Sequence, residues 1–77
     1  MNVTFEQVRD IVADAISCDL EQVKPETNLY DDLEIDSLDA VELSMALQEA
    51  LGVGIADEDL EKIKTVDDIV QYLRSKE

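Results

Sequence analysis

Apolar residues recur at helical spacing near both ends of the chain, and this periodicity constrains the fold more than any other feature of the sequence. They lie three or four positions apart after Thr4, which forms a capping-box pair with Gln7 and so marks the start of a helix over residues 4–17. The i, i+3, i+4, i+7 pattern returns over residues 66–73. The chain has one Phe, two Tyr and no Trp, fewer aromatic residues than an all-β domain normally uses. We therefore expect an all-α fold.

The middle of the chain adds two helices and a long connection. A helix over residues 37–51 is expected to end at Gly52, a residue favoured just past a helix terminus, and a short helix is expected over 57–63. The connection over 18–36 is too apolar for a loose linker, so we expect these side chains to anchor it to the core: Leu20, Val23, Leu29, Tyr30, Leu33 and Ile35. The prediction is a small four-helix bundle, with three longer helices, one short helix and a long ordered loop, in a single domain over residues 1–77.

The charge of the chain is strongly acidic and unevenly distributed. It has 20 Asp and Glu residues against 6 Lys and Arg, a formal net charge of -14. This charge argues against nonspecific nucleic-acid binding and against attraction to anionic membranes. No Lys or Arg lies between Lys24 and Lys62, while carboxylates recur throughout that stretch. Segregated charge of this kind favours docking to soluble partners that carry basic patches.

Several kinds of site are disfavoured by what the sequence lacks. Cys18 is the one cysteine and the chain has no His, so we expect neither an internal disulfide nor a metal site. The N-terminus has no signal-peptide pattern, and no apolar run approaches the ~18 residues of a membrane span. We expect a cytoplasmic monomer without membrane insertion.

The helix predicted over residues 37–51 carries two apolar faces. Because each residue advances about 100° around a helix, one side gathers the expected core residues Ala40, Leu43, Leu47, Ala50 and Leu51. On the other side apolar residues alternate with carboxylates: Leu38, Val41 and Met45 with Glu42 and Glu49. An apolar ridge among carboxylates is typical of a partner-docking surface, where apolar contacts give affinity and charges give steering. The alternative is that the preceding loop folds over this face and buries it.

Ser37 stands where this helix begins, directly after Asp36. One interpretation is that Ser37 or Asp36 only caps the helix, since both residue types are common at that position. The chain has no His for a triad and no neighbouring Lys or Arg to activate the hydroxyl, so a nucleophilic serine enzyme is disfavoured. An exposed hydroxyl there is suited to receive a group from another enzyme, because a phosphodiester would lie beside free backbone N–H groups.

The segment around Ser37 closely resembles the signature of a known family. Residues 36–49, which begin Asp-Ser-Leu-Asp, are similar to the signature segment of acyl carrier proteins, and 28–33, 55–63 and 65–69 resemble other parts of that family. The resemblance implies that Ser37 receives 4'-phosphopantetheine from coenzyme A through a separate phosphopantetheinyl transferase. The thiol of the arm then carries growing acyl chains as thioesters to fatty-acid synthesis enzymes, and the carrier itself performs no chemistry.

The resemblance also implies which surfaces the carrier uses. Basic patches of partner enzymes are expected to dock at Asp36, Leu38, Asp39, Val41, Glu42, Met45 and Glu49. The growing chain is expected to be sheltered in a pocket lined by Leu47, Ile55, Leu60, Ile63 and Ile69. Leu60 and Ile69 stand where smaller residues are common in the family, so we expect them to shorten the chain that can be sheltered. Glu34 stands where the family usually has Gly, so the loop before Ser37 is expected to differ locally.

Three other functions stay open at the level of sequence. One is a carrier for a specialised polyketide, lipid-modifying or aminoacyl pathway. A second is an acidic calcium-binding protein, since Asp57, Asp59 and Glu61 match the first three alternating positions of a calcium loop, although Lys62 occupies the position that requires Gly. The third is a nonenzymatic interaction module in which Ser37 stays unmodified.

Overall fold

Four α-helices and one 3₁₀ helix follow one another along residues 3–76, the part of the chain that the computed structural model describes. They are α1 (Phe5–Ile16), the 3₁₀ helix η1 (Leu20–Gln22), α2 (Ser37–Leu51), α3 (Asp57–Leu60) and α4 (Val66–Ser75). Extended pairing within these residues is limited to one isolated bridge between Asn28 and Thr65. The predicted all-α fold, with three longer helices, one short helix and a long ordered loop, is confirmed.

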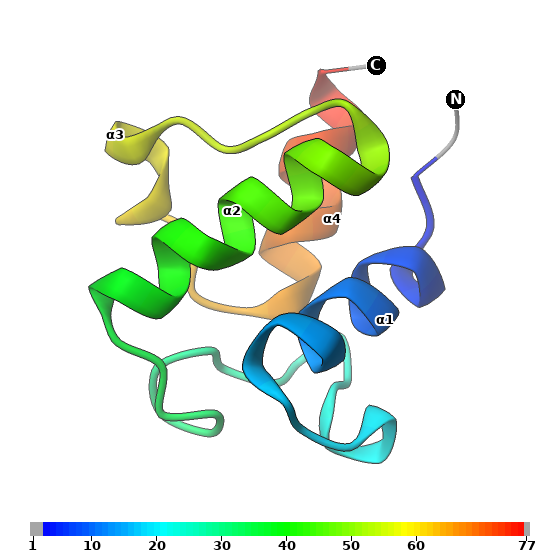
Figure 1. The fold of residues 1–77 in the computed structure, drawn as a ribbon, viewed down its shortest axis with the longest axis vertical. Coiled ribbons are helices and arrows are strands. Elements are labelled where there is room, and N and C mark those ends of the chain that lie inside the picture. The colour runs from blue at the N-terminus through cyan, green and yellow to red at the C-terminus, as the bar shows by residue number, and fades with distance from the viewer. Residues whose placement is uncertain (1–2, 77) are drawn as a thin grey trace.

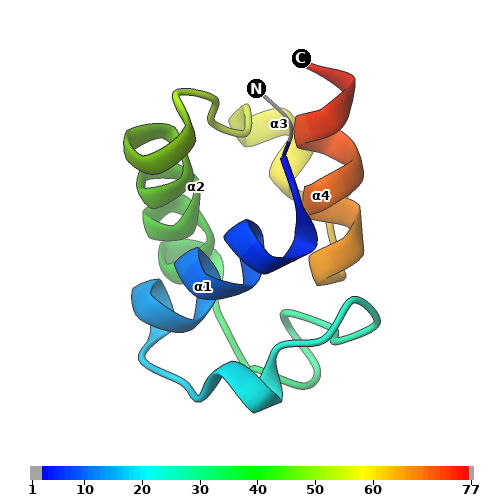
Figure 2. The same cartoon turned by 90° about the vertical axis from the view of Figure 1, so that its right-hand side faces the viewer.

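The three longer helices surround a common core. α1 packs against both α2 and α4, and α3 lies against α2. In Figure 1 α2 crosses in front of α4, and Figure 2 shows these two helices on opposite sides of the molecule, with α1 running between them. The connection from α1 to α2 closes the lower end of the bundle in both views. One face of α2 therefore points away from the rest of the fold.

The first and last helices begin with the capping exchange that their sequences suggest. The Thr4 hydroxyl accepts a hydrogen bond from the backbone N–H of Gln7 (3.3 Å), and the Gln7 side chain accepts one from the backbone N–H of Thr4 (3.1 Å). The same exchange joins Thr65 and Asp68 at the start of α4. These bonds satisfy N–H groups that a helix leaves without internal acceptors, and so they fix where each helix begins.

Asp68 is held more tightly than a capping box requires. One oxygen of its carboxylate accepts hydrogen bonds from the backbone N–H groups of both Lys64 and Thr65, each at 3.1 Å. Burial by itself raises the pKa of the Asp68 carboxyl, but the hydrogen bonds from Lys64 and Thr65 outweigh it and hold the pKa below its usual value. The charged form of Asp68 therefore stabilises the start of α4.

The core is built from one face of each longer helix. All four members of the apolar stripe on α4 are buried, from Val66 to Leu73. The residues predicted to form the core face of α2 are buried too, with one exception. Ala50 is exposed, so the prediction for this residue is wrong. Its methyl group lines an open groove between α1 and α2, which leaves it accessible to solvent.

The connection from α1 to α2 is fixed by hydrogen bonds to the start of α4. The backbone N–H of Leu29 donates to the carbonyl of Lys64 (2.7 Å), and the backbone N–H of Val66 donates to the carbonyl of Thr27 (3.1 Å). The buried Thr27 hydroxyl also donates to the carbonyl of Gln22 within the connection. Backbone groups of a segment without a long helix thus find partners, which explains how the loop stays ordered.

Four of the six side chains predicted to anchor this connection do so. Three are buried and the fourth is partly buried: Val23, Leu29, Ile35 and Leu33. The prediction is wrong for Leu20 and Tyr30, which are 49% and 36% exposed. Leu20 begins η1, a short turn that the apolar pattern does not reveal and that leaves this side chain at the surface. Tyr30 lies at the surface with its hydroxyl 3.4 Å from the carbonyl of Leu60.

The helix predicted over residues 57–63 is shorter in the structure. α3 ends at Leu60, and the next N–H groups make tighter bonds, from Lys62 to the carbonyl of Asp59 and from Ile63 to that of Leu60. Ile63 is buried, and Thr65 caps α4 two residues later, so no room is left for a further helical turn.

Polar side chains of two longer helices hold the α3 region in place. The Ser44 hydroxyl of α2 donates to the carbonyl of Ile55 (2.9 Å) and accepts from its N–H (3.0 Å). The Tyr72 hydroxyl of α4 donates to the carboxylate of Asp59 (2.8 Å). α3 is therefore tied to both α2 and α4, although it has only one turn.

The backbone of Glu34 is left-handed, with a φ angle of 55°. A side chain with a Cβ costs about 1–2 kcal/mol in this conformation, and a Gly loses roughly 0.5–1 kcal/mol of extra entropy on folding. We therefore expect Glu34→Gly to unfold in urea with a free energy about 0.5–1 kcal/mol higher than that of Glu34→Ala. Both variants lose the same charge, so the difference reports the backbone alone.

The exposed residue Glu26 provides the matched control for this experiment, because it has no positive φ angle. The Glu26→Gly variant should be no more stable than the Glu26→Ala variant. The same order of stability at Glu26 as at Glu34 would contradict the explanation.

Candidate functional site

α2 begins with hydrogen bonds that Asp36 and Asp39 exchange. The carboxylate of Asp36 accepts from the backbone N–H of Asp39 (2.9 Å), and the carboxylate of Asp39 accepts from the backbone N–H of Asp36 (3.3 Å). Of the two residues that the sequence offers as a cap, Asp36 supplies it, and Ser37 is the first residue inside the helix. The Ser37 side chain is consequently not needed to start the helix.

The hydroxyl of Ser37 is exposed and available. It makes no hydrogen bond to any of the residues 3–76. The backbone N–H groups of Ser37 and Leu38 lie in the first turn of α2, where a helix supplies no acceptor. The positive end of the helix dipole lies there as well, so a phosphate linked to the hydroxyl would meet favourable donors. The start of α2 therefore fits a phosphodiester on Ser37.

A shallow, mostly apolar depression of about 200 Å³ lies directly beside Ser37. It is formed by residues from three separate segments: Tyr30, Ser37, Ala40, Val41, Leu60 and Glu61. The Tyr30 hydroxyl donates to the carbonyl of Leu60 (3.4 Å) and so links the loop before α2 to the end of α3. A flexible group attached to Ser37 thus has an apolar surface within reach.

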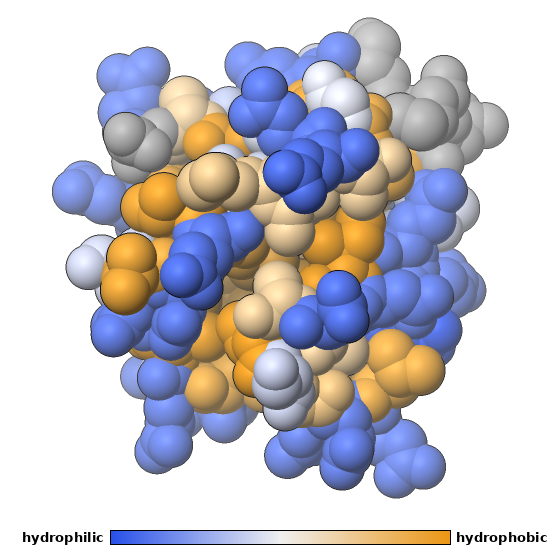
Figure 3. Space-filling model, in the orientation of Figure 1, coloured by the Kyte–Doolittle hydropathy of each residue, from blue (hydrophilic) through white to orange (hydrophobic). Residues whose placement is uncertain are grey.

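The outward face of α2 is open to solvent. Leu38, Val41 and Met45 are 65%, 40% and 58% exposed, and the interleaved carboxylates Glu42 and Glu49 are exposed as well. Figure 3 shows apolar side chains gathered along the line of α2, with hydrophilic groups between them. The alternative that the preceding loop covers this face is therefore wrong. We call these five residues the outward face of α2.

The residues predicted to line an acyl pocket fall into two groups. Four of them are buried in the core: Leu47, Ile55, Ile63 and Ile69. Leu60 is partly buried, and it alone among the five also lines the depression beside Ser37. Tyr30 and Glu61 also line this depression, and the sequence does not predict them as neighbours of Ser37, because no local pattern brings these distant positions together.

Other candidate groups add little to the site. Cys18 is partly buried, and burial, followed by the nearby charge of Asp19, raises the pKa of its thiol. Among the side chains that the structure describes, which do not include that of Asp57, there is no group of three or more His, Cys, Asp or Glu residues that could hold a metal ion. None of the helices described has both the length and the apolar character that crossing a membrane requires.

The chain matches known proteins over most of its length. Residues 6–73 match the family model described as a phosphopantetheine attachment site. The chain is 50% identical to an acyl carrier protein of Helicobacter hepaticus over 72 residues, which cover 94% of this chain and 95% of that protein. It is 52% identical over 72 residues to an acyl carrier protein of Thermosynechococcus vestitus, covering 94% of this chain and 89% of that protein.

A solved structure agrees with these matches. The solution structure of a protein from Anaplasma phagocytophilum, assigned as an acyl carrier protein, superposes with a TM-score of 0.79 and 41% identity, covering 94% of this chain and 85% of that one. Proteins of this family hold a covalently attached phosphopantetheine group and act as carriers, not as catalysts. The family match over residues 6–73 and the identity of half the residues to two such carriers show that the chain belongs to the acyl carrier protein family.

Proposed function

We propose that Ser37 carries the 4'-phosphopantetheine arm and that the protein delivers growing acyl chains to the enzymes of fatty-acid synthesis. A separate phosphopantetheinyl transferase attaches the arm, taken from coenzyme A, to the Ser37 hydroxyl as a phosphodiester. The observation that carries the proposal is the position of Ser37, which is exposed at the first turn of α2 while Asp36 performs the capping. When bound, the arm supplies a thiol that holds the acyl group as a thioester.

The residues of the chain itself bind the partner enzymes, orient the phosphate and shelter the acyl chain. Tethering the acyl group to Ser37 gives it a high effective concentration at whichever enzyme has bound the carrier. The free N–H groups of the first turn of α2 support the phosphate, and the carboxylates of Asp36 and Asp39 are already held by backbone donors. The phosphate is therefore oriented by the backbone and does not depend on a basic side chain.

The outward face of α2, with Asp36 and Asp39, is proposed as the surface where the enzymes dock. Its exposed apolar side chains supply contact area, and its carboxylates attract basic patches on the transferase and on the synthesis enzymes. We propose that the protein acts as a monomer, because a net charge of -14 disfavours association with a second copy. The cytoplasm, where such enzymes would meet it, stays a prediction.

The acyl chain is proposed to enter through the depression beside Ser37. From there the chain would pass Leu60 and reach the apolar space among Leu47, Ile55, Ile63 and Ile69. These side chains are buried, so they or α3 must shift to admit an acyl chain. Shelter between the helices keeps the thioester and its apolar chain away from water.

Ser37→Ala should abolish loading and leave the fold intact. Incubation of the native protein with coenzyme A and a broad-specificity phosphopantetheinyl transferase should add one arm, detected by intact mass spectrometry. The variant should gain no mass, and its unfolding free energy should change by less than about 0.5 kcal/mol, because Asp36 keeps the cap.

Ser44→Ala serves as the control on the same helix. Ser44 is partly buried and bonded to Ile55, so this variant should be less stable but should accept the arm normally. A normal mass gain in Ser37→Ala would mean that another residue is the attachment site.

Glu42→Lys should weaken docking much more than Glu6→Lys. Both side chains are exposed and both substitutions change the net charge equally, but only Glu42 lies on the outward face of α2. The measurement is kcat/KM of the transferase for loading Ser37, at low salt and at about 0.1 M salt, where exposed charges are screened beyond ~10 Å. The loss in Glu42→Lys should be several-fold and should shrink as salt rises. Equal losses in the two variants would show that net charge alone governs recognition.

Leu60→Ala should allow longer acyl chains to be sheltered. Each methylene left in water forgoes about 0.8 kcal/mol of burial, so the melting temperature of the acylated protein should rise with chain length and then reach a plateau. Removing the Leu60 side chain enlarges the depression beside Ser37 and should move that plateau to longer chains.

Leu38→Ala deletes the same atoms from the outward face of α2, where Leu38 is 65% exposed, and should leave the plateau in place. A plateau that stays unchanged in Leu60→Ala would show that Leu60 does not limit the chain.

A further inference from the structure

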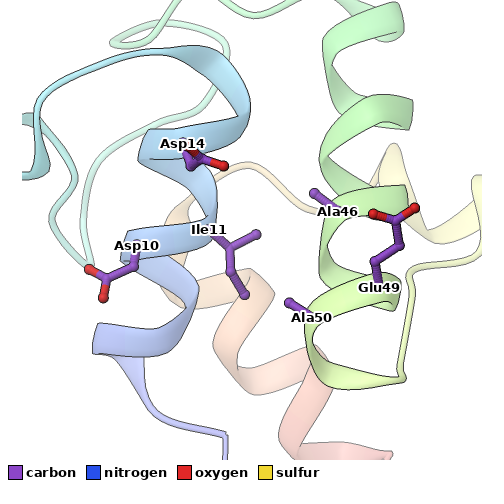
Figure 4. Close-up of a pocket in the computed structure, with 6 residues that line it drawn as sticks. All are labelled: Asp10, Ile11, Asp14, Ala46, Glu49 and Ala50. Carbon is purple, nitrogen blue, oxygen red and sulfur yellow. The ribbon is translucent and has the colours of Figure 1, made fainter.

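A groove of about 540 Å³ lies between α1 and α2 and shares no lining residue with the depression beside Ser37. It is lined by three apolar and three acidic side chains: Asp10, Ile11, Asp14, Ala46, Glu49 and Ala50. Figure 4 shows Ile11 extending from α1 toward the two alanines of α2. Because alanine side chains are small, they leave this part of the α1–α2 boundary open, with an apolar floor.

The negative charge beside this floor is largely uncompensated. Asp14 of α1 and Glu49 of α2 are exposed, and neither carboxylate makes a hydrogen bond or an ion pair within the described part of the chain. Asp10, in contrast, is paired with Arg9, whose guanidinium lies 3.0 Å from its carboxylate. No Lys or Arg is among the residues that line the groove. Both helices therefore present a free carboxylate to a ligand that binds there.

The negative charge beside the groove restricts the kinds of molecule that can bind there. A second copy of the chain would bring another net charge of -14, and nucleic acids or anionic membranes would be repelled in the same way. A cationic segment with an apolar side chain matches both the floor and the two carboxylates. Glu49 also belongs to the outward face of α2, so the groove is continuous with the proposed docking surface.

We propose that this groove binds a basic amphipathic segment of a partner protein. An apolar side chain of that segment would rest on Ile11, Ala46 and Ala50, and Lys or Arg side chains would pair with Asp14 and Glu49. The carrier thus has a second contact surface, which does not depend on Ser37 or on its arm.

A titration followed by NMR tests this assignment on the full chain. The probe is an Ala-rich helical peptide with Leu along one face and Lys on both sides of it, and the control peptide has Glu in place of every Lys. At low ionic strength the Lys peptide should shift the backbone amide signals of Ile11, Asp14, Ala46 and Ala50 most. The Glu peptide should produce no shifts.

Paired variants identify the charges that matter. Asp14→Asn combined with Glu49→Gln should weaken peptide binding about fivefold or more, as expected when two partly shielded charge pairs are lost. Asp31→Asn combined with Glu21→Gln removes the same two charges from exposed positions elsewhere and should have a much smaller effect. Asp14→Asn alone should also weaken peptide binding, and loading of Ser37 by the transferase, measured in parallel, should be normal in this single variant, because Asp14 lies on α1 and outside the outward face of α2. Failure of this proposal can therefore be told apart from failure of the carrier function.

Four results would overturn the proposal. They are an absence of binding, an equal loss of affinity in the two paired variants, and shifts that are largest at Leu38, Val41 and Met45. The fourth is a change in the groove signals on dilution of the protein without peptide, which would identify a second copy of the chain as the occupant.

Discussion

The hydrogen bonds that Asp36 and Asp39 exchange fix the first residue of α2. The presentation of Ser37 at the end of this helix depends on that starting point. Because side chains advance about 100° per residue, Leu47 and Met45 lie on different sides of the helix that begins there, Leu47 in the core and Met45 in solvent. A start one residue earlier or later would alter the way Ser37 is presented at the helix terminus. One pair of short-range bonds thus supports both the proposed attachment site and the proposed docking surface beside it.

The sequence predicts the longer helices well because their signals are local. The caps at Thr4 and Thr65 and the apolar stripes that follow them lie within one helix each, so periodicity finds them without knowledge of the fold. The end of α3 and the turn at Leu20 are decided differently. At both places the backbone conformation depends on the space that other elements leave. A pattern along the sequence does not show how much space that is.

The candidate site also has some features that the sequence predicts and others that it does not. The exposure of Ser37 and of the outward face of α2 follows from helical geometry, and the sequence predicts both. The depression beside Ser37 does not follow from it, because Tyr30 and Glu61 come from separate segments and meet only after folding. Ala50 was misplaced for a related reason: periodicity gives the direction of a side chain, but it does not say whether a neighbouring helix is close enough to cover it.

Because Asp36 caps α2, the hydroxyl of Ser37, the proposed attachment site, is not needed for folding. Since the hydroxyl of Ser37 makes no bond to the described chain, esterifying it removes nothing that the native state needs. The fold can therefore form before the arm is added, and it can persist after the arm is cut off. If the arm is attached at Ser37 as proposed, the same polypeptide could lose and regain it repeatedly without refolding.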